Sequence, residues 1–150
     1  MKEQNKKLKS DKLKILIVSH PYNVYDKYIG YPIVNFLNKM DIEIIYADKL
    51  DKNISIALSK KLSSTLYWKY SKELIGAIEY YKYNIDGIIF LTTFPCGSDS
   101  LVNELMIRKI NNIPITNILI DESIAEAGIH TRLESFIDII KGKKEKNEKK

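Results

Sequence analysis

The chain alternates short apolar runs with longer segments in which apolar residues recur at helical spacing. Four of the runs are rich in β-branched residues and show no regular alternation with polar ones. This pattern is typical of strands that are buried on both faces of a parallel sheet. The predicted strands are residues 14–19, 43–47, 87–93 and 115–120.

Helices are expected between these strands and after the last one. They are predicted over residues 30–40, over 51–83 as a short piece and a long one, over 101–110, and from residue 131 onward. Pro32 fits a first helical turn, and Thr131 with Glu134 fits a capping box. The stripe from Leu66 to Tyr81 recurs at steps of four and three. We expect this stripe to be core, so most of the ten tyrosines need no ligand.

Strands that alternate with helices, without a clear hairpin turn, predict a three-layer α/β domain of the Rossmann-like (flavodoxin-like) type. We expect about four parallel strands in the order 2-1-3-4. The length of 150 residues suits one domain, which we place at residues 13–141. Residues 1–12 and 142–150 are rich in lysine and are expected to be a disordered N-terminal extension and a disordered tail.

The net charge of +5 comes from the two ends of the chain. The first 14 and the last ten residues hold 12 of the 24 basic residues but four of the 19 acidic ones. The segment between them carries 12 basic against 15 acidic side chains. Because no recognisable nucleic-acid-binding module accompanies the basic ends, we expect no nucleic-acid partner.

The sequence also bears on location. No apolar run approaches the ~18 to 20 residues of a membrane span, and the basic start lacks the apolar stretch and cleavage site of a secretory signal. The single cysteine, Cys96, allows no internal disulfide. We therefore expect a cytoplasmic protein without membrane association.

Polar residues follow the predicted strands, and in open parallel sheets ligands bind beyond the carboxyl ends of the strands. Neither G-x-G-x-x-G nor a P-loop motif is present, so no nucleotide site is predicted. The candidate cofactor-binding residues at this edge are His20, Pro21, Tyr22, Gly97, Ser98, Asp99, Ser100, Asp121, Glu122, Glu126 and Arg132.

Cys96 lies between a predicted strand and a predicted helix, whose amino-terminal amides favour a thiolate. A thiolate at this position can ligate a metal, or act as a nucleophile with His20 as its base. A small residue packed in a tight turn is the ordinary alternative.

Three carboxylates, Asp121, Glu122 and Glu126, lie within six positions near the same edge. They can coordinate a cation, or hold Arg132 and His20 in a polar network. Helix capping and solvation explain them equally well.

Three separated motifs resemble one protein family. The run LTTFPCGSDSLVNE at residues 91–104, the carboxylates at 121–128 and residues 131–138 resemble the C-terminal domain of the 2-hydroxyacyl-CoA dehydratase D-component and its double-cubane and acyl-CoA dehydratase activase-related relatives. Residues 20–32 resemble the opening of that domain in the activase-related branch. The chain departs from the family pattern at Ser98, usually Pro, and at Ala125, usually Gly.

The resemblance implies that Cys96 is a metal ligand of an iron–sulfur cluster of the 4Fe-4S type, in a protein of anaerobic metabolism. Such a cluster takes about four ligands, and the family draws further cysteines from an N-terminal domain. We therefore expect a cluster shared with a cysteine-bearing partner domain or subunit, or with another copy of the chain. A separate ATP-dependent activator is also implied, which injects the electron used in dehydration.

Two functions follow as hypotheses. The first is an iron–sulfur electron-transfer or 2-hydroxyacyl-CoA dehydratase-like component, inactive as an isolated chain, to which Cys96 contributes one ligand. The alternative is a non-catalytic α/β module that has lost the cluster and binds a small ligand or a protein.

Overall fold

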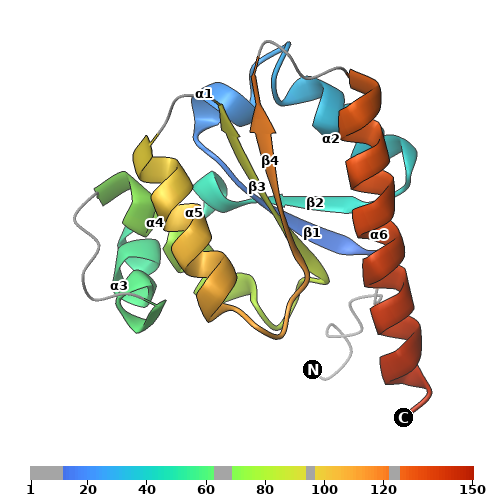
Figure 1. Ribbon diagram of the computed structural model, residues 1–150. Helices are drawn as coiled ribbons and strands as arrows, with labels where there is room; N and C mark the ends of the chain where they lie inside the picture. The colour runs from blue at the N-terminus through green and yellow to red at the C-terminus, as the bar shows by residue number, and fades with distance from the viewer. Residues whose placement is uncertain (1–11, 63–68, 94–96, 122–125) are drawn as a thin grey trace, which may run out of the picture.

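The computed structural model describes residues 12–62, 69–93, 97–121 and 126–150 (Figure 1). In these ranges four strands form one sheet in which every pairing is parallel, and the strand order is β2-β1-β3-β4. This confirms the predicted α/β class and strand order. The strands are β1 (Lys14–Val18), β2 (Glu43–Tyr46), β3 (Gly87–Thr93) and β4 (Ile115–Ile120).

The two central strands, β1 and β3, are the most deeply buried part of the sheet. Ile15 of β1 pairs with Gly87 of β3, and the pairing continues to Val18 and Phe90. Both strands are apolar throughout most of their length because helices cover both faces of the sheet. The unbroken apolar runs in the sequence therefore reflect burial on two sides.

Helices form a layer on each side of the sheet (Figure 1). On one side, α2 and α6 pack against β1 and β3 in one hydrophobic cluster, and on the other side α4 and α5 pack in a second cluster. The helices, with one 3-10 turn η1, are α1 (Pro21–Val24), α2 (Tyr31–Lys39), η1 (Ala47–Lys49), α3 (Lys52–Leu62), α4 (Lys69–Tyr81), α5 (Gly97–Lys109) and α6 (Glu126–Glu148).

The structure corrects the prediction for the last helix. Thr131 lies inside α6, which includes Glu126, so the predicted start at Thr131 is wrong. The Thr131 hydroxyl donates to the Ala127 carbonyl oxygen at 3.0 Å, a bond that a threonine makes within a helix rather than at its cap. A capping-box pattern inside an amphipathic helix cannot be told from a true cap by spacing alone.

The carboxyl end of the chain also differs from expectation. Helix α6 continues through Glu148, into the segment for which a disordered tail is predicted. Lysine and glutamate favour helix, and Lys143 Nζ donates to the Asn112 carbonyl oxygen at 2.7 Å, which ties this part of α6 to the loop before β4. The predicted N-terminal extension, apart from Lys12, lies outside the described residues.

The stripe that is predicted to be core is buried where the structure describes it. Leu74 and Ile78 are buried and Tyr81 packs against the core, while Leu66 and the side chain of Tyr70 lie outside the described residues. Six other tyrosines are 49–85% exposed. They lie outside the periodic stripe, and these exposed residues are Tyr22, Tyr25, Tyr28, Tyr31, Tyr80 and Tyr83.

Helices α3 and α4 approach each other closely through small residues. Ser55 and Ser59 of α3 are 1% and 0% exposed, and the Ser55 hydroxyl donates to the carbonyl oxygen of Glu73 on α4. A Cβ atom placed on Gly76 of α4 would overlap the backbone of Ser55. The contact therefore requires glycine at position 76 for close approach, and not for an unusual backbone angle.

Replacing Gly76 with alanine should destabilise the protein, although alanine is the better helix former. We expect Gly76→Ala to lower the free energy of unfolding by about 2 kcal/mol, because the added methyl group forces α3 and α4 apart. Gly142→Ala in α6 is the matched control, since a Cβ there meets nothing within 4 Å. It should raise stability by about 0.5–1 kcal/mol. Urea unfolding of both variants measures the difference, and equal effects would contradict the packing argument.

Candidate functional site

The carboxyl ends of β1 and β3 lie side by side in the middle of the sheet. From β1 the chain passes through α2 to β2 on one side, whereas β3 joins on the other side of β1. The strand order therefore changes direction between β1 and β3. In open α/β sheets ligands bind at the carboxyl ends of the strands at this position.

The segment that leaves β1 forms a tight turn around His20. The carbonyl oxygen of His20 accepts hydrogen bonds from the amides of Asn23 at 3.0 Å and Val24 at 3.1 Å, and from the Ser19 hydroxyl at 3.3 Å. Its imidazole stacks on the ring of Tyr22, with centroids 5.0 Å apart and planes 11° apart. These contacts fix His20 at the start of α1.

A buried side chain connects this turn to the end of β3. The hydroxyl of Thr93 donates to Oδ1 of Asn23 at 3.3 Å, and Asn23 is 2% exposed. The bond joins residues 70 positions apart in the sequence. It holds the segments that follow the two central strands against each other.

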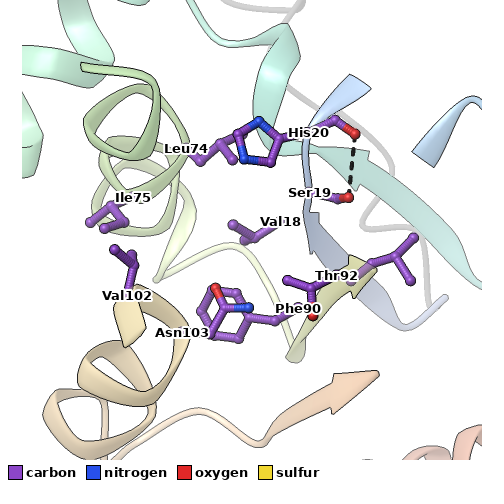
Figure 2. Close-up of a pocket in the computed structure, with 10 residues that line it drawn as sticks. Val18, Ser19, His20, Leu74, Ile75, Phe90, Thr92, Val102 and Asn103 are labelled. Carbon is purple, nitrogen blue, oxygen red and sulfur yellow. Dashed lines mark hydrogen bonds between the residues drawn. The ribbon is translucent and has the colours of Figure 1, made fainter. Parts of the chain in front are cut away.

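A small cavity lies next to this junction, on the side of the sheet covered by α4 and α5 (Figure 2). About 20 Å³ of it is open to the centre of a water-sized sphere. Among the described residues that line it, six side chains are apolar and none carries a carboxylate, a guanidinium or an ammonium group. The lining residues are Val18, Ser19, His20, Leu74, Ile75, Phe90, Leu91, Thr92, Val102 and Asn103.

Two polar side chains in the cavity wall have buried atoms without a hydrogen-bond partner, Thr92 Oγ1 and Asn103 Nδ2. The residues are 3% and 6% exposed. Neither is among the sequence-predicted site residues. Asn103 could have been recognised from the sequence. It lies between Val102 and Met106 on the buried face of α5, where an apolar residue is expected.

Of the predicted site residues whose side chains the structure describes, His20 alone lines the cavity. Pro21 and Tyr22 lie in α1, and Tyr22 is 64% exposed. Gly97 and Ser100 are exposed residues in the first turn of α5.

The remaining predicted residues lie around β4. Asp121 directly follows β4 and is half-buried. Arg132 of α6 donates from Nη2 to the carbonyl oxygen of Asn117 at 3.3 Å, so its observed contact is with the β4 backbone. Cys96 and Glu122 lie outside the described residues, as do the side chains of Ser98, Asp99 and Glu126.

His, Cys, Asp and Glu side chains are the usual metal ligands in proteins. In the described ranges no group of three or more His, Cys, Asp or Glu residues is arranged to hold a metal ion. The whole chain has one cysteine, whereas a common iron–sulfur cluster takes about four ligands, usually thiolates. The chain by itself therefore does not fit a complete cluster.

An aromatic group borders the same edge of the sheet near β2. The hydroxyl of Tyr25 donates to both carboxylate oxygens of Asp48 at 3.1 Å, and Lys49 Nζ lies 5.0 Å from the centre of the Tyr25 ring. The ring of Tyr46 lies 5.6 Å from that of Tyr25. Burial raises the pKa of Tyr46 above its ordinary value of 10.0, and the negative charge of Asp48 adds to the effect.

The chain matches no protein-family model, no curated protein and no solved structure. Within the described ranges no helix combines the length and the apolar character that crossing a bilayer requires. The evidence on function therefore comes from the residues and their geometry.

The Asn23–Thr93 bond predicts different effects for two adjacent threonines. Thr93→Val leaves buried Asn23 Oδ1 without its donor and should lower the free energy of unfolding by about 1–2 kcal/mol. Thr92→Val removes a hydroxyl that has no protein partner and should leave stability unchanged or raise it by about 1 kcal/mol. Denaturant titration of the two variants measures this, and an equal loss in both would show that the bond does not hold the turn.

The raised pKa of Tyr46 predicts that the protein loses stability at alkaline pH. Its phenol resists ionisation in the folded chain, while in the unfolded chain it ionises near its ordinary pKa of 10.0. Stability is therefore fully present below that pH and falls as the pH rises above it. Tyr46→Phe should show a smaller fall between pH 9 and 11, roughly the range around that pKa, by urea unfolding at each pH. An unchanged slope would contradict the prediction.

Proposed function

We propose that this chain is an iron–sulfur electron-transfer or 2-hydroxyacyl-CoA dehydratase-like component that works in the cytoplasm. It contributes Cys96 as one ligand of a cluster, and a cysteine-bearing partner domain or subunit, or another copy of the chain, supplies the others. When bound, the cluster supplies one-electron transfer. The proposal rests on the family resemblance of the residues together with the geometry at the carboxyl edge of the sheet.

The observation that carries the proposal is the hydrogen bond between Thr93 and Asn23. Asn23 lies in the segment 20–32, which resembles the opening of the family's domain, and Thr93 lies three positions before Cys96 in the second resembling segment. Two family-like motifs that are distant in sequence thus follow neighbouring strands and are bonded to each other. This is the arrangement expected if both serve one site.

The start of α5 suits a thiolate ligand. Helix α5 begins at Gly97, directly after Cys96, and contains 13 residues. The free amides and dipole at a helix amino end stabilise negative charge nearby. A Cβ on Gly97 would meet no atom of the described residues within 4 Å, so none of these residues blocks the approach of a partner chain there.

The experiment is anaerobic purification of the tagged chain from its own cells, together with whatever remains bound to it. We expect iron and visible absorbance to accompany the wild-type complex and to be lost in Cys96→Ser, because serine does not replace a thiolate as a cluster ligand. Ser135→Ala, at an exposed position of α6 that is not among the candidate site residues, is the matched control and should retain the iron. The measurement is the ratio of iron to chain.

Equal iron content in the wild type and Cys96→Ser would overturn the proposal. The single cysteine favours a second candidate function, a non-catalytic binding module that has lost the cluster. That function predicts that Cys96→Ser keeps the same bound partner as the wild type and that neither complex carries iron.

A further inference from the structure

The cavity between β1, β3, α4 and α5 contains two unsatisfied buried polar atoms, Thr92 Oγ1 and Asn103 Nδ2. Buried polar atoms in folded proteins nearly always have a hydrogen-bond partner, so a pair of exceptions in one cavity needs an explanation. Figure 2 shows the amide of Asn103 and the side chain of Thr92 among the residues that surround the space. Both residues are more than nine-tenths buried.

The two atoms define the group that would satisfy them. Asn103 Nδ2 only donates hydrogen bonds, while the Thr92 hydroxyl both donates and accepts. One oxygen atom, of a carbonyl or a hydroxyl group, accepts from both. A charged group is disfavoured, because no carboxylate, guanidinium or ammonium group among the described lining residues compensates for its burial.

The size and lining of the cavity indicate which part of a ligand enters it. The open volume of about 20 Å³ is enough for about one water-sized group. The rest of the wall is largely apolar and includes Val18, Leu74 and Val102, which suit the carbon atoms next to the oxygen. An ordered water typically makes about three hydrogen bonds, whereas the wall offers two unpartnered polar atoms. An oxygen bonded to carbon fits this wall better.

We propose that the cavity is a binding subsite for the neutral, oxygen-bearing end of a small aliphatic molecule, such as a primary amide, a ketone or an alcohol. Its oxygen accepts hydrogen bonds from Asn103 Nδ2 and the Thr92 hydroxyl, and its carbon atoms contact the apolar wall. The position is the point where the strand order reverses, which is where α/β sheets bind ligands. The subsite goes beyond the proposed cluster role and does not depend on Cys96.

The test is an NMR titration of the isotope-labelled chain with acetamide and propan-2-ol, each of which carries one neutral oxygen-bearing end. We expect a saturable shift of the Asn103 side-chain amide with both compounds and none with acetate, which carries a charge. Asn103→Leu and Thr92→Val should each weaken binding about tenfold, because each removes one hydrogen bond to the ligand oxygen. Binding to Asn103→Leu is followed through the backbone amides that line the cavity.

Asn117→Leu is the matched control. Asn117 Oδ1 is also buried without a partner, and by strand register Asn117 lies beside Phe90, but it does not line the cavity. This change also removes a buried amide and should leave binding unchanged. Leucine and valine preserve the size of the side chains they replace, so each variant is expected to fold. Circular dichroism checks this.

Three outcomes would overturn the subsite. These are the absence of a saturable shift, equal affinity in the wild type and Asn103→Leu, and a long-lived water at Asn103 that neither compound displaces. All titrations are repeated in Cys96→Ser without iron. If acetamide and propan-2-ol bind to Cys96→Ser as they bind to the wild type, the subsite does not depend on the cluster. The failure of one proposal then does not decide the other.

Discussion

The parallel pairing of β1 with β3 is the contact on which the rest of the molecule depends. Both strands are covered by helices on both faces, so their backbone groups have no water to bond and must pair with each other. The pairing is fixed at its amino end, where the Lys14 amide donates to the Asp86 carboxylate at 2.8 Å and the Asp86 amide donates to the Lys14 carbonyl oxygen at 2.7 Å. At its carboxyl end the Thr93–Asn23 bond performs the same task.

These two fixed ends explain why the candidate site is where it is. A one-residue shift of β3 along β1 would move Phe90 and Thr92 to the opposite face of the sheet, away from α5. The Thr93 hydroxyl would then also lose Asn23. The same register therefore sets the core, the cavity wall and the junction of the segments that follow β1 and β3.

The fold places its unsatisfied polar atoms in one region. In the described part of the chain, Thr92, Asn103 and Asn117 carry the buried side-chain atoms without partners, and the first two share a cavity. Elsewhere buried polar groups are paired, as for Ser55 and Ser59, whose hydroxyls donate to backbone carbonyl oxygens. Thr92 and Asn103 depart from the full hydrogen bonding of the rest of the described core, and such departures are expected at functional sites.

The sequence by itself determined the class of fold, the strand order and the bounds of β3 and β4, because short apolar runs that alternate with helical segments are typical of a parallel α/β sheet. It also placed His20 at the edge of the sheet that faces the cavity. It misplaced the start of α6, because a capping-box pattern inside a helix has the same spacing as a true cap. Only the tertiary structure decided that Asn23 bonds Thr93 and that Thr92 and Asn103 meet in one cavity. These contacts join β1 to β3 and β3 to α5, and their partners are chosen by strand register and helix packing, which local patterns of residues do not encode.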